Sequence, residues 1–185
     1  MKFDELKNLI EREGLKYFVA PDRPVIMLGM VGIFGRYQMV IPLELDGRFL
    51  QFRTVGYLSC PADHAHVDAV LRVLVELNYR LRLTKFGWDP SDGEIAAYAD
   101  IWLEDGTLTQ AQFTRMLQSF IPGIDLNYPR ISRTIETGTD PGELKPEDIS
   151  GAMPGLPPAL RGLIDRLTGK PSRDRPREPE GPIEI

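Results

Sequence analysis

Cysteine and histidine are scarce in this chain of 185 residues, which has Cys60 alone and histidines only at His64 and His66. One cysteine cannot form an intrachain disulfide and suits a reducing cytoplasm. A structural metal site normally has four ligands, and two histidines spaced two apart in a helix do not share one face. We therefore expect no disulfide, no metal ion and a cytoplasmic location.

Long apolar runs and an excess of basic residues are also missing. The longest nearly apolar stretch, Val25 to Gly35, is about eleven residues long and too short to span a bilayer. The N-terminal sequence lacks the cationic start and apolar run of a secretory signal. The net charge is -5, and acidic residues outnumber basic ones on both sides of Gly138. Neither membrane nor nucleic acid is therefore an expected partner.

Two motifs that could suggest a bound ion or cofactor fail on their spacing. Gly29, Gly32 and Gly35 recur every third residue, but a strand pattern follows them, whereas a dinucleotide cradle needs a helix there. The segment Asp89 to Glu94 superficially matches a calcium loop, yet its Gly93 is fifth instead of sixth. That segment is more typical of a hairpin turn. We expect no cofactor.

Two groups of charged residues have simple structural interpretations. Asp100, Glu104 and Asp105 could in principle form an acid and base pair, but they lie near a strand end and before a helix, where turn and surface groups are common. Five basic residues could gather beside a sheet and grip single-stranded RNA, although the aromatic-rich pattern of such sheets is missing; they are Arg48, Arg53, Arg80, Arg82 and Lys85. We therefore expect the basic residues to form a solvated face, and we do not expect the carboxylates to make the protein an enzyme.

The first half of the chain has the pattern of a helix followed by three strands. Apolar residues at helical spacing predict a helix that ends near Gly14. Three strands are predicted over Val25 to Ile33, Tyr37 to Leu45 and Phe49 to Leu58, with Asp46-Gly47 as a two-residue hairpin turn. Pro42 suggests that its strand lies at an edge or contains a bulge.

The second half alternates helices with a hairpin. A helix is predicted over Asp63 to Leu77, and alternation of Tyr79, Leu81 and Leu83 with polar residues predicts a strand directly after it. A second strand follows the turn at residues 89 to 94. Thr109 and Gln112 have the spacing of a capping box that opens the next helix. After Pro122-Gly123 the pattern allows one more helix.

Beyond Gly138 proline and glycine become frequent, and the composition predicts a linker followed by a disordered tail. One amphipathic helix is predicted within it, near residues 157–168, started by Pro157 and Pro158 and ended by Gly169. A free helix of this length is only marginally stable in water, and its exposed apolar residues would favour aggregation. We therefore expect these residues to bind a partner or dock on a surface. The predicted partner-binding residues are Leu156, Leu160, Leu163, Ile164 and Leu167.

The most specific pattern runs from Asn78 to Phe120. It has Asn78-Tyr79 at a helix end, a strand closing on Lys85-Phe86-Gly87, the loop from Trp88 to Glu94, a second strand, and Leu108-Thr109 before an amphipathic helix. This order resembles the bacterial YbjN-type domain, a family of sensory transduction regulators whose fold is similar to that of type III secretion chaperones. The resemblance implies a noncatalytic protein that binds other proteins; secretion chaperones act as dimers and hold extended segments of their clients.

Together these patterns predict an α+β domain over residues 1–137, with helices on an antiparallel sheet of about five strands in the order α-β-β-β-α-β-β-α(α), and an appendage over residues 138–185. An open sheet has edges that accept an added strand, and its helices form grooves for apolar anchors. We therefore expect a chaperone-like or regulatory domain that binds extended or helical segments of protein partners, a second copy of the chain among them. A small-ligand sensory domain is the alternative, followed by an unrecognised enzyme or an RNA-binding module.

Overall fold

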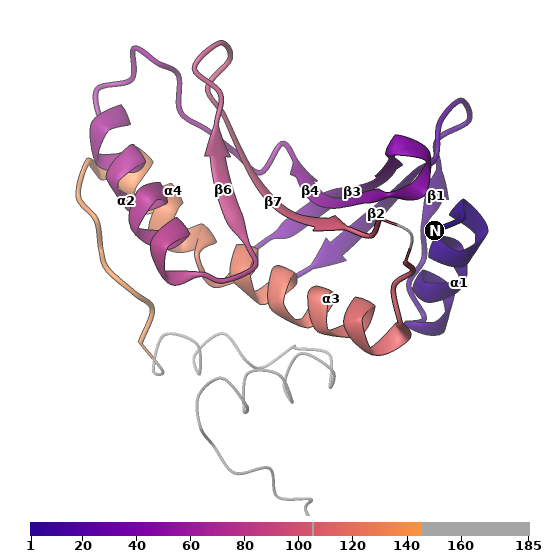
Figure 1. Cartoon of the computed structure of the whole chain (residues 1–185). Helices are drawn as coiled ribbons and strands as arrows, with labels where there is room; N and C mark the ends of the chain where they lie inside the picture. Colours follow the sequence, from indigo (N-terminus) through magenta and orange to yellow (C-terminus); the bar gives the residue numbers. More distant parts are fainter. Residues whose placement is uncertain (105, 146–185) are drawn as a thin grey trace, which may run out of the picture. The chain divides into compact units, whose positions relative to one another are not determined.

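A computed structural model describes residues 1–104 and 106–145 of the chain (Figure 1). Residues 1–144 form one compact unit. The elements in chain order are α1 (Phe3–Arg12), β1 (Phe18–Val19), β2 (Val25–Val31), β3 (Arg36–Glu44), the 3-10 turn η1 (Leu45–Gly47), β4 (Phe49–Val55), β5 (Leu58–Ser59), α2 (Val67–Arg80), β6 (Lys85–Trp88), β7 (Glu94–Trp102), α3 (Gln110–Asp125) and α4 (Tyr128–Thr137). The predicted α+β class is confirmed, and the short strands β1 and β5 enlarge the sheet to seven strands.

Every strand pair in the sheet is antiparallel, and the strand order is β1-β2-β3-β4-β7-β5, with β6 also paired to β7. Strands β4 and β5 lie on the same side of β7, because β6 occupies its other side. Gly56, with a φ of 59°, interrupts the extended backbone between β4 and β5. The outer strands of the sheet are therefore β1 and β6.

One face of the sheet is covered and holds the core. Along β4 the side chains alternate, so that Leu50 and Phe52 are fully buried whereas Arg53 is exposed. Helix α3 lies along the covered face (Figure 1), and the ring centroid of Phe52 is 5.6 Å from that of Phe113 and 5.9 Å from that of Phe120. The capping box of Thr109 at the start of this helix is confirmed. None of the described helices lies over the opposite face.

The strand predicted over residues 79–84 is wrong. Helix α2 continues to Arg80, where the amide of Leu81 still donates to the carbonyl of Leu77, and β6 begins only at Lys85. Leu81 and Leu83 lie in the connection and pack partly against the core. A connection whose alternate residues contact the core has the same period as a half-buried strand, so periodicity alone does not separate the two.

The predictions for Pro42 and for the turn after it also need correction. Strand β3 lies between β2 and β4 and is not an edge strand. Its registered pairing with β4 is interrupted at Ile41 and Pro42, so the N–H that Pro42 lacks costs the sheet little hydrogen bonding there. The turn is longer than two residues, because Glu44 pairs with Phe49 and leaves residues 45–48 to connect the strands. Leu45 and Asp46 both have positive φ there.

A buried carboxylate ties the β2–β3 connection to the end of α3. Asp125 accepts hydrogen bonds from the amides of Ile33 (2.6 Å) and Phe34 (2.9 Å) and from the hydroxyl of Tyr37 (2.7 Å). Burial, and then the hydrogen bond to Asp125, raises the pKa of Tyr37, so its phenol stays protonated and donates. A Cβ atom on Gly32 would lie 2.2 Å from Asp125 Oδ1. Gly32, directly after β2, therefore allows the close approach of the backbone to this carboxylate.

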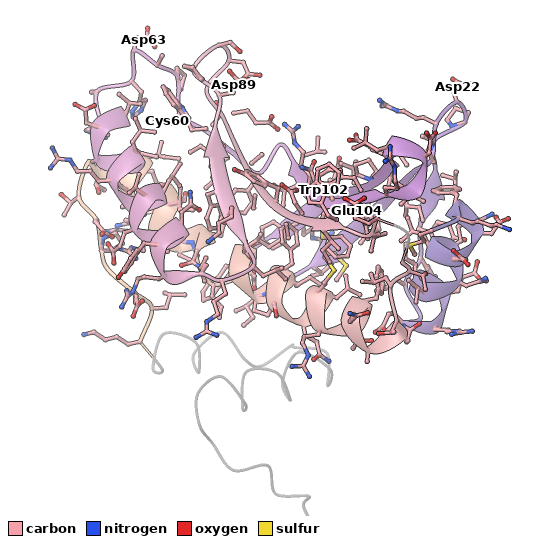
Figure 2. All side chains as sticks on the ribbon, viewed as in Figure 1. Asp22, Cys60, Asp63, Asp89, Trp102 and Glu104 are labelled. Atoms are coloured by element: carbon pink, nitrogen blue, oxygen red, sulfur yellow. The ribbon has the colours of Figure 1, made fainter. Side chains whose placement is uncertain are left out.

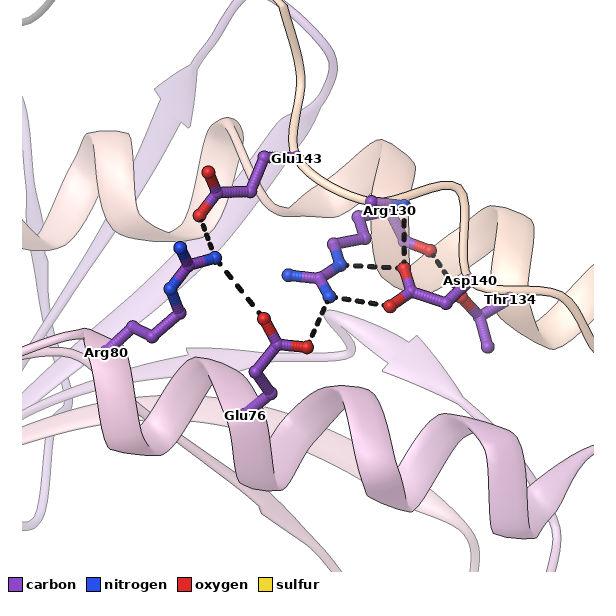
Figure 3. A network of polar contacts seen from close by, with 7 residues as sticks. Glu76, Arg80, Arg130, Thr134, Asp140 and Glu143 are labelled. Atoms are coloured by element: carbon purple, nitrogen blue, oxygen red, sulfur yellow. Dashed lines mark hydrogen bonds and ion pairs between the residues drawn. The ribbon is translucent and has the colours of Figure 1, made fainter.

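A second polar network joins α2, α4 and the segment after α4 (Figure 3). Arg130 is only 3% exposed, and it donates from Nε and Nη2 to both carboxylate oxygens of Asp140 and from Nη2 to Glu76. Glu76 also pairs with Arg80, which contacts Glu143. The chain therefore remains attached to the helices for several residues past Gly138. The predicted boundary at residue 137 stays a prediction, while the compact unit runs to Leu144.

Candidate interaction surface

The uncovered face of the sheet carries a row of side chains that crosses five strands. Residues directly opposite each other in antiparallel strands point to the same face. The strand register pairs Phe18 with Met27, Met27 with Val40, Val40 with Arg53, and Arg53 with Tyr98. Apolar side chains therefore occupy the β1 to β3 part of this row, and a cation and a phenol occupy the β4 and β7 part.

Large apolar side chains are exposed on this face. Phe18 is 76% exposed, and Trp102 is 62% exposed with its ring centroid 5.0 Å from that of Phe49, its partner on β4. Val31 and Val55 are exposed as well. Single exposed apolar residues are ordinary, but several on one face rimmed by polar groups mark a binding surface. We call the five-strand row with Phe49 and Trp102 the open sheet face.

Two hollows lie on the open sheet face and share Gln51 and Arg53. The larger, about 450 Å³, extends toward Trp88 and Tyr98, and the smaller, about 280 Å³, extends toward Val40 and Pro42. Because they share two residues, they are neighbours, and together their linings extend from the β6–β7 hairpin to β2. The smaller hollow lies where β3 and β4 lose their regular pairing at Pro42.

Three polar side chains that line the larger hollow already have hydrogen-bond partners on the sheet. Arg53 Nη2 donates to Glu94 Oε2 over 2.8 Å, and Gln51 Nε2 donates to Asp100 Oδ1 over 2.8 Å. Asp89, at the tip of the β6–β7 hairpin (Figure 2), accepts from the hydroxyl and amide of Ser91, which lowers the pKa of this carboxyl. The turn role expected for Asp89 is therefore confirmed. Side chains that already form hydrogen bonds with their neighbours are better suited to binding another molecule than to transferring a proton.

The edge of the sheet at β6 is closed by a side chain. Asn78, in the last turn of α2, accepts from the amide of Phe86 over 2.7 Å and donates to the carbonyl of Phe86 over 2.9 Å. Lys85 reaches back and donates to the carbonyls of Asn78 and Leu81. Asn78 belongs to the most specific part of the sequence pattern, and its role is to occupy the backbone groups that an added strand would need.

Other residues singled out in the sequence are held apart by the structure. His66 directly precedes α2, and its Nδ1 lies 2.8 Å from the carbonyl oxygen of Ile135, so it joins α2 to α4. Arg80 pairs with glutamates on the helical side, whereas Arg53 lies on the sheet, so the basic residues form no common patch. Asp100 binds Gln51, and Glu104 sits at a φ of 47°. Burial raises the pKa of the Cys60 thiol, which makes it a weak nucleophile.

The predicted partner-binding residues lie outside the described residues, as does Asp105. Within residues 1–104 and 106–145, no group of three or more acidic, histidine or cysteine side chains is placed to hold a metal ion. In the same part of the chain, none of the helices is long and apolar enough to cross a membrane.

Sequence reasoning did not find the open sheet face. A signal was available in β4 and β7, where the residues that alternate with the core positions include Phe49, Val55 and Trp102. A purely solvated face would carry polar residues at all of these positions. Only the strand order, however, brings Phe18 and Met27 into line with them.

The fold and the open sheet face define an α+β domain that presents one side of an antiparallel sheet. A family model described as "Putative bacterial sensory transduction regulator" matches residues 2–133, and the chain therefore belongs to the YbjN family. The resemblance drawn from the sequence is thereby confirmed.

Several solved structures resemble the chain, among them a YbjN protein and a chaperone-effector complex. The crystal structure of YbjN from E. coli, described as a "putative transcription regulator", is 16% identical with a TM-score of 0.47, over 68% of this chain and 86% of that chain. The HopA1-SchA chaperone-effector complex gives 14% identity and a TM-score of 0.46, over 66% of this chain and 90% of that chain. No curated protein sequence matches the chain.

Proposed function

We propose that this domain is a noncatalytic protein-binding module, regulatory or chaperone-like, that holds an extended segment of a partner protein on the open sheet face. One observation carries the proposal: no described helix covers the five-strand row of Phe18, Met27, Val40, Arg53 and Tyr98, whereas the other face of the sheet holds the core. The family's description as a regulator agrees with a role exerted through binding.

The distribution of side chains indicates what such a segment looks like. Its apolar residues would meet Phe18, Met27 and Val40, and its charged residues would meet the Arg53–Glu94 ion pair, which is partly exposed and weak. The two neighbouring hollows follow one another across the strands, so one chain could contact both. A partner with alternating apolar and charged residues fits both.

A small-ligand sensory function is the second candidate, favoured by the larger hollow. Trp88 and Tyr98 line it together with Arg53 and Glu94, and its volume of about 450 Å³ is within the range of small-molecule sites. A thermal-shift screen of polar metabolites tests this candidate, because a ligand that binds only the native state raises the melting temperature. Loss of that shift in Arg53→Ala would assign the ligand to the hollow.

The protein-binding proposal is tested with peptides. Twelve-residue peptides are selected from a phage-displayed random library on the full chain, and their dissociation constants are measured by fluorescence anisotropy. Phe18→Ser with Met27→Ser removes two exposed apolar groups, which should cost about 1.5–3 kcal/mol of binding, or about ten- to a hundredfold in Kd.

Val75→Ser is the matched control, since Val75 is also a large exposed apolar residue but lies on α2. It should leave the Kd unchanged. If no peptide is selected, or if the selected peptides bind the Phe18 and Met27 double variant as tightly as the unaltered chain, the open sheet face is not the binding surface.

A further inference from the structure

Within the described residues, the edge of β7 is unpaired where β6 ends. Strand β7 spans Glu94–Trp102, but β6 pairs with it only as far as Lys85 opposite Tyr98. Asn78 closes the β6 part of this edge. In the described part of the chain, no strand pairs with β7 on this side beyond Tyr98. The edge is therefore protected in one half and open in the other.

The hydrogen bonds of β7 show which of its backbone groups point to the open side. The amide of Ala97 donates to Thr54 Oγ1 and that of Leu103 donates to the carbonyl of Arg48, so these odd-numbered residues face β4. Direction alternates along an antiparallel strand. The N–H and C=O groups of Asp100 and Trp102 therefore point away from β4, toward the side where β6 is missing.

An apolar groove lies beside this bare segment. It has a volume of about 420 Å³ and is lined by Leu83, Ile101, Leu108 and Met116, with Gln112 and Arg115 of α3 among its polar residues. An edge with unpaired backbone groups beside side-chain cavities is the arrangement that strand addition uses: the backbone gives affinity, and the cavities give specificity.

The charge of the groove indicates the partner's chemistry. Among the described residues that line it, Arg115 alone is charged, and Arg115 is exposed. An acidic side chain on an added strand would meet this guanidinium at the rim, while apolar side chains two residues away along the same face of the strand would enter the groove.

We propose that the edge of β7 at Asp100 and Trp102 is a strand-addition site for an extended segment of a partner protein that carries apolar residues at alternate positions and a carboxylate for Arg115. This inference rests on the protein-binding function proposed above and assigns that partner class a second contact. Trp102 belongs to both surfaces, because it lies on the open sheet face and lines the groove.

The test uses the full chain and four fluorescein-labelled eight-residue peptides in which threonine alternates with valine. One peptide has a glutamate in place of a central valine, one has a lysine there, and two are versions of the glutamate peptide that are N-methylated on either the even or the odd residues. Only alternate N–H groups of an added strand face the edge. One N-methylated version should therefore bind at least tenfold more weakly, and the other should bind like the parent peptide.

Charge reversal provides the second measurement. In the unaltered chain the glutamate peptide should bind more tightly than the lysine peptide. Arg115→Glu should reverse this preference, so that the lysine peptide binds more tightly by about the same ratio of Kd values. The control Arg72→Glu makes the same change on α2 and should alter neither Kd. Equal binding of both N-methylated versions, an unchanged preference in Arg115→Glu, or failure of every probe to bind overturns the proposal.

The two proposals fail separately. If library-selected peptides bind and depend on Phe18 and Met27 while none of the alternating peptides bind, the open sheet face stands and the β7 edge does not. If neither set of peptides binds, the protein-binding function itself is contradicted.

Discussion

The two faces of the sheet differ sharply within a single strand. On β4, Phe52 is fully buried between two phenylalanines of α3, whereas the next residue, Arg53, is exposed and pairs with Glu94. The covered face holds the fold together through close packing. The uncovered face keeps apolar groups such as Phe18 in water, where they add nothing to stability and are free to contact a partner under the proposed function. The comparison separates the residues that maintain the fold from those available for a partner.

The largest effect should come from the covered face. Phe52→Ala removes a fully buried aromatic side chain and should lower the free energy of unfolding by about 3–5 kcal/mol. Arg53→Ala removes an exposed ion pair and should change it by about 1 kcal/mol or less. Urea unfolding followed by circular dichroism measures both. Similar losses for the two variants would show that the two faces contribute equally to the free energy of unfolding.

The next effect concerns the contact between Gly32 and Asp125. Gly32→Ala places a Cβ atom 2.2 Å from the carboxylate and should displace it from the amides of Ile33 and Phe34, at a cost of about 2–3 kcal/mol. In an Asp125→Ala background the same substitution should cost much less, because the obstructing carboxylate is gone. Additive losses in this double-mutant cycle would contradict the contact.

A smaller effect is expected at the end of the compact unit. A fragment of residues 1–137 should fold cooperatively, in keeping with the predicted boundary, but it lacks Asp140 and leaves buried Arg130 with Glu76 as its remaining carboxylate partner. A fragment of residues 1–144 should be more stable by about 1–3 kcal/mol. Equal midpoints in urea would mean that residues 138–144 add nothing to the fold.

Low pH should abolish the contribution of Asp140 to the stability of the fold. The hydrogen bond from Arg130 lowers the pKa of the Asp140 carboxyl, so its stabilisation is present above the ordinary carboxyl pKa and is lost as the pH falls through the lowered value. The unaltered chain should therefore exceed Asp140→Asn in melting temperature at neutral pH, and the difference should shrink below about pH 4. A difference that does not depend on pH would show that the charge of Asp140 is not what stabilises.

Local patterns in the sequence predicted the class of the fold because its elements carry local signals. The capping box at Thr109 and the turn at Asp89 need only neighbouring residues, and both are confirmed. The Asp125 contact joins residues about ninety positions apart, with no local signature. The open sheet face likewise depends on strand order. The helix predicted near residues 157–168, with Leu160 and Leu163 as its anchors, stays a prediction outside the described residues.

Methyl NMR of the full chain, titrated with a library-selected peptide, tests the central claim most directly. Met27 and Met39 belong to neighbouring strands, but Met27 points to the open sheet face, whereas Met39 is buried beneath it. We expect the methyl signals of Met27, Val40 and Val55 to shift on binding while those of Met39 and Ile41 barely move. Shifts confined to Val75 on α2, or shared equally by both faces, would contradict it.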